Sequence, residues 1–405
     1  MSNYLTIPAP VYLADKIKGA ILPRTMYDLL SGHLVDSTSG EILSRKYFDL
    51  EGSSLHLNFD MGSIEIPETG EICHVSGAIP LLAQWHCPTV GHTPILRNNH
   101  KNEEHEIFAH LAKFDFQEMQ NLAQKVKYVH LLVKASVPPD FEISHQNLLP
   151  VVYGNIFGFV IDDIFDNLKN SGVQDGNVLI AMSKICSGNT SNGYGSLGIN
   201  PEICKFLVDC KRKFEQMEKF AGESGPAIES TTEWLRTEGE ALFESGIYKT
   251  IPAYLSERSY TSAFRCSCEV MALALHINIT LEQRRDPVFK RMQDVWATLG
   301  GLMNDVYSLP KDVRNRDKSN YLIILSQTEN KAIFPCLKDL LEETMPKMVQ
   351  EIRFLQQQLL HKFGMDEALE NYFKVVNNIY DATAKWAPMS GRYGHCKGVK
   401  MVFVK

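Results

Sequence analysis

The chain has 405 residues, and 41 lysines and arginines stand against 48 aspartates and glutamates, so its formal net charge is −7. Nucleic-acid binders usually present a basic face, and this charge balance argues against a nucleic-acid partner. An acidic protein can still bind a polyanion where divalent metal ions bridge the like charges. The hydrophobic fraction of 44% and charged fraction of 22% are those of an ordinary soluble globular protein.

Cysteine usage and hydropathy bear on the location of the protein. The nine cysteines include no C-x-x-C pair, which favours free thiols in a reducing compartment. The first twenty residues lack the unbroken apolar run of a signal peptide. No stretch approaches the roughly 18 apolar residues that a membrane span needs. We therefore expect a cytoplasmic protein without stable membrane insertion, either a monomer or a homodimer.

Residues 1–100 are frequently interrupted by glycine and proline. Between these turn-forming residues, Leu55, Leu57 and Phe59 alternate with polar residues, and Ile64 and Ile66 do the same. A period of two predicts short strands or extended loops. We expect a low-helix N-terminal extension that packs on the rest of the chain.

From about residue 101 to residue 405 the hydrophobic period is helical, which predicts an all-α body. Asn200 followed by Pro201 is typical of a helix start, whereas the glycine-rich segments 188–198 and 222–225 are predicted to be loops. Several helices are apolar over more than half their circumference, so they must be buried or line an apolar cavity. After a first helical stretch from Asn102, helices are predicted near residues 148–168, 201–221, 228–246, 252–277, 284–309, 329–362 and 366–387.

Three aspartates lie within an otherwise apolar helical stretch, GNIFGFVIDDIFDNLKN. An α-helix turns by about 100° per residue, so Asp162 and Asp166 lie one turn apart on the same face. Carboxylates placed in this way repel each other unless a cation lies between them, and hard oxygen ligands suit Mg²⁺. The alternative interpretation is a solvated acidic turn near the end of a helix.

A second polar pattern lies in GGLMNDVYSLPKD. Asn304, Ser308 and Asp312 recur at every fourth residue and fall along one helical stripe, where they offer an amide oxygen, a hydroxyl and a carboxylate. Lys311 beside them could reach a phosphate oxygen. Pro310 has no backbone N–H and is expected to kink or end the helix. The alternative interpretation is a helix C-terminus with ordinary polar residues.

Together, these motifs resemble those of the class I terpene synthase (terpene cyclase) family, over about residues 100–395. The second motif matches the family pattern N-D-x-x-S-x-x-K-[ED]. Arg258 lies 46 residues before Asn304, which is the spacing of the diphosphate-sensing arginine in bacterial members. The pair Arg392-Tyr393, with Trp386 upstream, is similar to the C-terminal pair of those members. The long N-terminal extension and the residues at the variable positions of the motifs look most like those of the coral (octocoral) terpene cyclases, which are related to the microbial-type enzymes.

The resemblance implies a class I terpenoid synthase helical bundle around an apolar active-site cavity, and a reaction that depends on Mg²⁺. It implies three metal ions, which Mn²⁺ can replace. Asp162 and Asp166 would bind metal on one wall, with Asp163 as a supporting hydrogen-bond partner. Asn304, Ser308 and Asp312 would bind metal on the facing wall. Most microbial members have glutamate at the position of Asp312, so the shorter aspartate would draw its ion closer to the helix.

The resemblance also implies roles for residues outside the metal motifs. Arg258, Lys311 and Arg392 would contact diphosphate oxygens, and Tyr393 would donate a hydrogen bond to them. Thr261 and Ser262 follow the arginine where the family has a linker and an effector residue, whose backbone carbonyl faces the forming cation.

A carbocation must be kept from water, and aromatic faces can do so because cation–π attraction supplies neither a base nor a nucleophile. We expect such faces on helices near the two motifs. For each one the alternative is ordinary core packing. The candidates for the substrate pocket are Tyr153, Phe157, Phe159, Trp296 and Trp386.

The coral-like resemblance predicts that an isoprenoid diphosphate, geranylgeranyl diphosphate, is cyclised to a diterpene such as a cembrene-type macrocycle. A sesquiterpene cyclase acting on farnesyl diphosphate is the main alternative. A trans-prenyltransferase would need a second aspartate-rich motif, and a catalytically inactive interaction protein would not need intact metal motifs. A G-x-G-x-x-G match at 193–198 lacks a surrounding βαβ unit, and Cys73-His74 with His86-Cys87 has no usual zinc spacing.

Overall fold

The computed structural model describes residues 54–67, 69–82, 100–114, 122–138, 140–170, 176–188, 201–221, 225–243, 250–317, 319–364, 366–390, 392–393 and 398–404, together with short strands near the N-terminus. The G-x-G-x-x-G segment and the His86-Cys87 pair lie outside these residues. The side chain of Asp166 also lies outside them, although its backbone belongs to a described helix.

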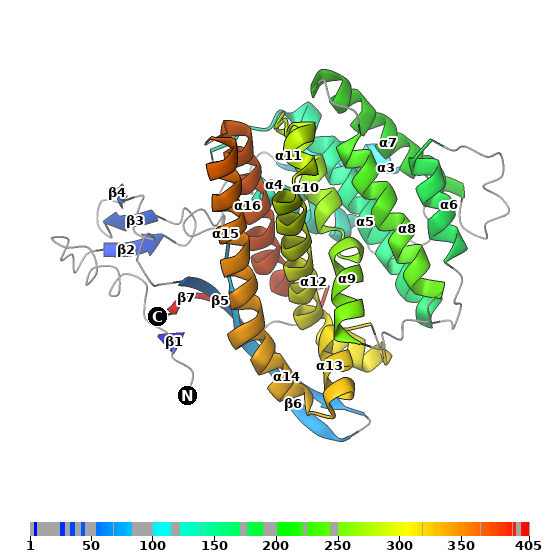
Figure 1. Ribbon diagram of the computed structural model, residues 1–405. Helices are drawn as coiled ribbons and strands as arrows, with labels where there is room; N and C mark the ends of the chain where they lie inside the picture. Colours follow the sequence, from blue (N-terminus) through cyan, green and yellow to red (C-terminus); the bar gives the residue numbers. More distant parts are fainter. Residues whose placement is uncertain are drawn as a thin grey trace.

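Helices make up the body of the molecule from residue 100 to residue 389 (Figure 1), and the predicted helical fold is confirmed there. The prediction was wrong at the C-terminal end, where Gly398–Val404 forms strand β7 because it pairs with a strand of the N-terminal extension. Pro201 begins a helix, as the Asn200-Pro201 pair predicts. The helices are α3 (His100–Leu111), α4 (Leu122–Ser136), α5 (His145–Asn170), α6 (Asn177–Cys186), α7 (Pro201–Ala221), α8 (Pro226–Phe243), α9 (Ile251–Thr261), α10 (Phe264–Ala274), α11 (Leu281–Arg285), α12 (Pro287–Asn315), α13 (Tyr321–Glu329), α14 (Ile333–Asp339), α15 (Met345–Phe363) and α16 (Glu367–Met389).

Three of the predicted helical stretches are divided in the structure. The first, from Asn102, forms the two helices α3 and α4. The predicted helix 252–277 is broken between α9 and α10, where Ala263 adopts a left-handed φ of 59° that a continuous helix cannot contain. The predicted helix 329–362 consists of α14, the π-helical segment η2 (Leu340–Thr344) and α15. Helices α6 and α13 were not predicted. Periodicity alone did not locate these breaks because single-residue backbone changes do not interrupt an apolar repeat.

Helix α12 runs from Pro287 to Asn315 and does not end at Pro310, which corrects the predicted helix end at residue 309. Asp286 caps its N-terminus by accepting a hydrogen bond from the Val288 N–H at 2.7 Å, and proline fits the first turn. An internal proline removes only one backbone hydrogen bond. Because α12 is buried along most of its length against α9, α15 and α16, packing outweighs that loss.

The N-terminal extension contains strands, as the alternating pattern predicts. Strand β5 (Ser54–Ile66) pairs antiparallel with β6 (Glu71–Pro80) on one side and with β7 (Gly398–Val404) on the other. The short strand β1 (Tyr4–Leu5) completes the order β1-β7-β5-β6. A second sheet has the order β2-β3-β4, formed by β2 (Thr25–Asp28), β3 (His33–Asp36) and β4 (Ile42–Ser44).

The β5–β6 hairpin packs against the helical body instead of forming a core of its own. Leu57 and Phe59 of β5 are buried, and the β-strands contact α12, α15 and α16. The Leu82 N–H donates to the buried Asp381 carboxylate of α16 at 2.8 Å, and Arg353 of α15 donates to the Leu81 carbonyl at 3.3 Å. Leu81 and Leu82, which directly follow β6, are therefore hydrogen-bonded to α15 and α16.

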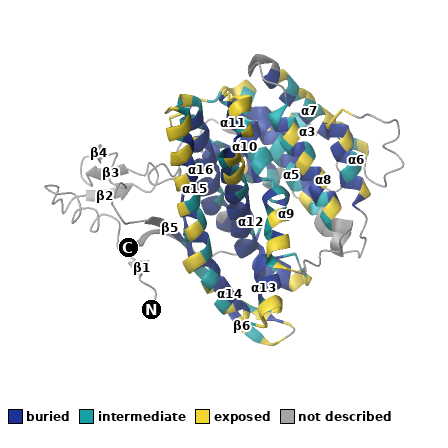
Figure 2. Cartoon of the chain, in the orientation of Figure 1, coloured by how far each residue is buried: buried dark blue, intermediate teal, exposed yellow. Residues whose placement is uncertain are grey.

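Burial is highest in the centre of the bundle. Figure 2 shows α12 mostly buried and the outer face of α15 exposed. Within the part of the chain that the structure describes, one helical stretch, His145–Ile164 of α5, is long and apolar enough to cross a membrane by length and composition. In this fold 61% of its apolar window is buried among other helices, as in the core helix of a globular protein.

The start of α6 touches α8 through backbone. A Cβ atom added at Gly176 would lie 1.8 Å from the Gly239 carbonyl oxygen, so neither element can yield by a side-chain rotation. We predict that Gly176→Ala lowers the free energy of unfolding by about 1–3 kcal/mol through overpacking, measured by urea denaturation. Gly158→Ala is the control, because its Cβ would meet only Trp234, at 3.9 Å, and a helical alanine is preferred over glycine. Equal stability of the two variants would contradict this account.

Candidate active site

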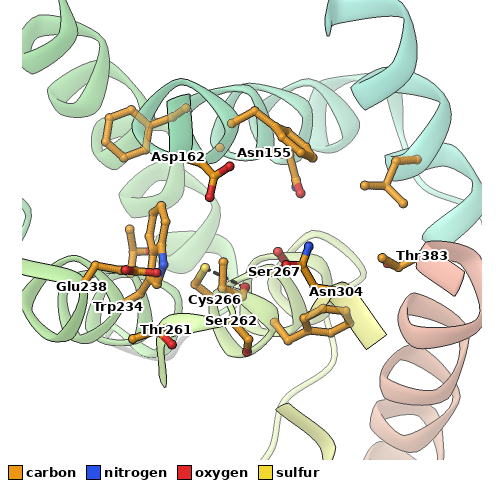
Figure 3. A pocket seen from close by; sticks show the side chains of 18 of the residues that line it. Asn155, Asp162, Trp234, Glu238, Thr261, Ser262, Cys266, Ser267, Asn304 and Thr383 are labelled. Atoms are coloured by element: carbon orange, nitrogen blue, oxygen red, sulfur yellow. Dashed lines mark hydrogen bonds between the residues drawn. The ribbon is translucent and has the colours of Figure 1, made fainter. Parts of the chain in front are cut away.

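One cavity of about 730 Å³ lies between α5, α8, the α9–α10 junction, α12 and α16. Figure 3 shows Asp162 and Asn155 pointing from α5 into this space, with Ser262, Ser267 and Asn304 across it. The cavity brings together most of the residues that were singled out from the sequence. Those that line it are Phe157, Phe159, Asp162, Arg258, Thr261, Ser262, Asn304, Ser308, Lys311, Asp312, Trp386, Arg392 and Tyr393.

The first acidic motif forms one wall near the end of α5. Asp162 lines the cavity and forms an ion pair with Arg392. Asp163 is turned aside, toward Lys125 of α4, and its second oxygen is 3.5 Å from Arg392. Two cations thus balance two adjacent carboxylates, which would otherwise repel each other. Asp163 does not line the cavity, and its placement beside the wall is compatible with the predicted supporting role.

The second motif forms the facing wall on α12. Asn304, Ser308 and Asp312 line the cavity as one stripe, as the spacing predicts. The Ser308 hydroxyl donates to the Asp312 carboxylate. The Asn304 amide donates to the Tyr393 hydroxyl at 2.7 Å, so the C-terminal pair contacts this wall as well as the first.

Burial controls the charge of Asp312. Its side chain is only 8% exposed, and this burial raises the pKa of the carboxyl from 3.8 to about 7. The hydrogen bonds from Ser308 and Asn320 act in the opposite direction, since they stabilise the carboxylate form. Protonation of this group therefore competes with any cation that it binds.

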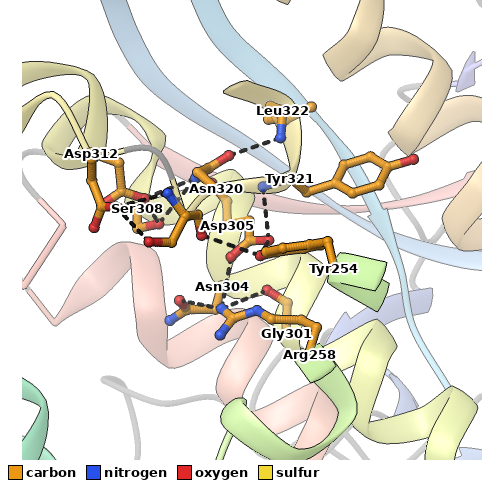
Figure 4. A network of polar contacts seen from close by, with 12 residues as sticks. Tyr254, Arg258, Gly301, Asn304, Asp305, Ser308, Asp312, Asn320, Tyr321 and Leu322 are labelled. Atoms are coloured by element: carbon orange, nitrogen blue, oxygen red, sulfur yellow. Dashed lines mark hydrogen bonds and ion pairs between the residues drawn. The ribbon is translucent and has the colours of Figure 1, made fainter. Parts of the chain in front are cut away.

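A buried carboxylate, Asp305, joins the second wall to the α9–α10 junction (Figure 4). It accepts hydrogen bonds from Arg258 at 2.7 Å and from the Tyr254 hydroxyl. The Tyr321 N–H, at the start of α13, donates to it at 3.3 Å. Burial raises the pKa of Asp305, and Arg258 and Tyr254 oppose that shift. This network fixes Arg258 at the cavity, where it also donates to Asn304 at 3.1 Å.

Asn320 is a second buried support of the same wall. Its side-chain amide donates to the Asp312 carboxylate and to the Asp305 carbonyl, each at 2.8 Å. Its oxygen accepts from the Leu322 N–H at 2.9 Å and thereby caps α13. Asn320, Asp305 and Tyr254 were not predicted from the sequence as site residues. Asp305 lies inside the recognised motif, whereas the sequence carries no signal for the other two.

The α9–α10 junction contributes Thr261 and Ser262 to the cavity. Helix α9 ends at Thr261, and carbonyls in a last helical turn lack their usual partners within the helix. The Ser262 hydroxyl is buried and has no hydrogen-bond partner among the described residues. The junction therefore places polar groups at the boundary between the carboxylate walls and the apolar part of the cavity.

Aromatic side chains surround the apolar part. Trp386 of α16 packs against Phe159 with ring centroids 5.5 Å apart, and its indole N–H donates to the Tyr128 carbonyl at 2.9 Å. The Arg392 guanidinium lies 4.8 Å from the Phe159 ring centre. Trp234 of α8 also lines the cavity, although the sequence analysis did not select it.

Two of the predicted pocket residues do not line the cavity. Tyr153 stacks on His110 at 4.3 Å, because it lies on the face of α5 opposite to Gly158 and Asp162. Trp296 is fully buried against Phe264 and donates to the Val376 carbonyl at 3.0 Å. Both are core residues, which was the alternative interpretation for each aromatic candidate.

Comparison with known proteins links this geometry to a family. Residues 154–333 match the family described as "Terpene synthase family 2, C-terminal metal binding". A (+)-eremophilene synthase from Sorangium cellulosum (strain So ce56) is 25% identical over 140 residues, which is 35% of this chain and 42% of that protein. The alignment thus spans less than half the length of that relative. These matches relate the central part of the chain, residues 154–333, to terpene synthases.

Solved structures share the fold at low sequence identity. A germacradien-4-ol synthase from Streptomyces citricolor has a TM-score of 0.56 at 15% identity, covering 72% of this chain and 94% of that one. A hedycaryol synthase in complex with HEPES has a TM-score of 0.56 at 14% identity, covering 76% and 99%. A single-residue variant of a cucumene synthase has a TM-score of 0.58 at 13% identity, covering 73% and 96%. The fold is therefore the class I terpene synthase helical fold.

Asn320 generates a prediction about stability. Asn320→Ala removes one of the two side-chain donors to the buried Asp312 carboxylate, the side-chain donor to the Asp305 carbonyl, and the cap of α13. We expect the free energy of unfolding to fall by about 1–3 kcal/mol, measured by urea denaturation. Asn320→Ser retains an N-cap acceptor and should lose less. An alanine variant as stable as the wild type would contradict the supporting role of Asn320.

Asp312 generates a prediction about pH. Because its pKa is about 7 in the folded chain and 3.8 as a free side chain, the folded state binds the proton more tightly between these values. The stability contributed by this group is therefore greatest at low pH and falls as the pH rises toward 7. We expect Asp312→Asn to reduce this dependence, measured by urea denaturation in chelator at several pH values. A wild type and a variant with the same pH profile would refute the assigned pKa.

Proposed function

We propose that this protein is a Mg²⁺-dependent class I terpene cyclase that ionises an isoprenoid diphosphate, cyclises the resulting carbocation and releases diphosphate. The observation that carries the proposal is the pair of facing walls, Asp162 on α5 and the Asn304–Ser308–Asp312 stripe on α12, in one cavity. Arg258, Lys311 and Arg392 add positive charge to the same cavity. Above an apolar chamber, this arrangement suits a ligand with an anionic head and a hydrocarbon tail.

The residues present fit a magnesium site. Mg²⁺ prefers oxygen ligands, keeps several waters and shares phosphate oxygens, so it needs few protein carboxylates. Both walls offer carboxyl, amide or hydroxyl oxygens, and no group of three histidine, cysteine or acidic side chains forms a closed cage among the described residues. Bound there, the metal would supply Lewis-acid stabilisation of the departing diphosphate. We propose three ions, with Mn²⁺ as a substitute.

The basic residues would bind the leaving group. Arg258 is held by Asp305, and Arg392 by the first wall, so both cations are positioned before substrate arrives. Fixed positive charge aimed at developing negative charge lowers a barrier because it needs no reorganisation during the reaction. Lys311 and the Tyr393 hydroxyl, which also line the cavity, would complete the contacts to diphosphate oxygens.

The aromatic chamber would protect the cation. Phe157, Phe159, Trp234 and Trp386 line the cavity and exclude water, while their ring faces attract positive charge. Backbone carbonyls at the α9–α10 junction would add negative partial charge beside the chamber. None of these rings acts as a nucleophile, so the shape of the aromatic chamber would decide which ring closure the carbocation undergoes.

We propose geranylgeranyl diphosphate as the substrate and a diterpene, of a cembrene-type macrocycle, as the product. This choice is supported by the long N-terminal extension and by the residues at the variable motif positions, which resemble those of the coral terpene cyclases. Farnesyl diphosphate is the second candidate. It is favoured by the match between this chain and a (+)-eremophilene synthase.

The test is incubation of the purified protein with C10, C15 and C20 prenyl diphosphates and Mg²⁺, followed by gas chromatography–mass spectrometry. We expect a cyclic hydrocarbon from the C20 substrate and none after chelation of the metal. A cyclic product from the C15 substrate alone would select the second candidate. The absence of product from a folded protein with every substrate would refute the cyclase proposal.

Single substitutions test the two walls in the same assay. Asp162→Ala and Asn304→Ala should each lower kcat by roughly 10²–10³-fold or more, because each removes a ligand oxygen that acts on the developing charge. Asp140→Ala is the matched control, since Asp140 is an exposed acid outside the cavity. Thermal melting checks that the variants remain folded. Full activity in both wall variants would show that the metal assignments are wrong.

A further inference from the structure

The C-terminal strand is bound to the N-terminal extension. Strand β7 runs antiparallel to β5 from the pair Asp60–Gly398 to the pair Ser54–Val404 (Figure 1). Gly398 follows Tyr393 by five residues, which reach at most about 18 Å when fully extended. Fixing the start of β7 therefore limits how far the Arg392-Tyr393 pair can move from its place.

Strand β5 is itself fixed to the helical body. Phe59 is buried and contacts the Tyr307 ring of α12 edge-on, with centroids 5.2 Å apart. On the paired strand β6, a Cβ atom at Gly77, which is opposite Phe59, would lie 2.3 Å from the Leu341 side chain of η2, so the sheet and helix pack closely. Strand β5 is thus a rigid support for a strand that pairs with it.

The same tyrosine of α12 joins the sheet to the cavity. The Tyr307 ring lies between Phe59 and Tyr393, with a centroid distance of 6.4 Å to Tyr393, and its hydroxyl donates to the Ala384 carbonyl of α16 at 2.8 Å. Tyr393 in turn accepts from Asn304, and Arg392 pairs with Asp162. The segment that touches both walls therefore has two supports from β5, one through strand pairing and one through packing.

We propose that strand β5 of the N-terminal extension is a positioning element of the active site: by pairing with β7 it holds Arg392 and Tyr393 over the diphosphate-binding end of the cavity. The inference rests on the proposed function for the identity of the ligand. Deletion or loosening of the β5–β7 ladder would leave the helical walls intact but release the Arg392-Tyr393 pair, which contacts both walls. A ladder that only covers a sheet edge would have no such effect.

The experiment places a proline in β7 of the full-length protein. Met401 and Val402 pair with Leu57 and His56 of β5. Because successive N–H groups of an antiparallel strand face opposite sides, one of these two residues donates to β5, and proline at that position removes the ladder hydrogen bond. Met401→Pro is compared with Met401→Ala, which changes the side chain and keeps the backbone donor. Val402→Pro and Val402→Ala, opposite His56, provide a second matched pair in case the first proline variant does not fold.

Two readouts do not depend on turnover. Hydrogen–deuterium exchange should become faster in the peptide that contains Arg392 and Tyr393, and remain unchanged in peptides from α12. Calorimetry with inorganic pyrophosphate and Mg²⁺ should show affinity about tenfold weaker in the proline variant. In the activity assay we expect kcat to fall by roughly 10²-fold, the cost of a misplacement of about 1 Å. The alanine variants should match the wild type in all three measurements.

The outcomes separate this proposal from the proposed function. Faster exchange at Arg392-Tyr393 with weaker pyrophosphate binding supports the positioning role, even if no prenyl diphosphate is turned over. Proline variants that fold, break the ladder and retain wild-type exchange at 392–393 and wild-type pyrophosphate affinity would overturn it. A wild-type protein that binds pyrophosphate but forms no terpene would count against the cyclase proposal alone.

Discussion

The Asp305 carboxylate is the buried charge on which the arrangement of the cavity depends. It lies on α12, is 2% exposed, and accepts from Arg258 of α9, from Tyr254 one turn earlier, and from the backbone at the start of α13. A buried carboxylate is costly unless it is paired and hydrogen-bonded, so the three elements must meet at this point for the chain to fold. The consequence is that Arg258 reaches the cavity in one defined position.

Asp305 and Asn320 hold the side chains of the second wall in place through hydrogen bonds. Asn304, Ser308 and Asp312 line the cavity, and Asp305 beside them accepts hydrogen bonds from Asn320 and Tyr321 at the start of α13. Asn320 joins Asp305 to the wall, because one amide group contacts both the Asp312 carboxylate and the Asp305 carbonyl. The oxygen atoms offered to a cation are thus held by hydrogen bonds that reduce their freedom before binding, which is the role that supporting residues have around metal ligands.

The first wall is organised differently. Asp162 and Asp163 are paired with Arg392 and Lys125, which come from the C-terminal segment and from α4. Their carboxylates therefore face cations from outside their own helix, whereas those of the second wall are supported by neighbouring helix ends. Arg392 can serve both walls because Tyr393 beside it contacts Asn304. In our proposal the position of this pair depends on β5, which belongs to the part of the chain that lies outside the matched family segment.

The sequence by itself determined features that depend on local spacing. The apolar period predicted the helical body and the alternation at Leu57 and Phe59 predicted the strands, because side-chain direction in a helix or strand follows residue number. The same rule placed Asn304, Ser308 and Asp312 on one stripe, and the motifs together indicated the fold class.

Only the tertiary structure decided which of several equivalent faces meets the cavity. Trp234 lines it and Trp296 does not, because the packing of neighbouring helices selects the face that stays open. The left-handed Ala263, the hydrogen bonds of Asn320 and the pairing of Leu57 with Met401 join residues whose relation no local pattern records. Contacts of this kind arise only when distant segments are brought together, so they could not be read from the order of residues.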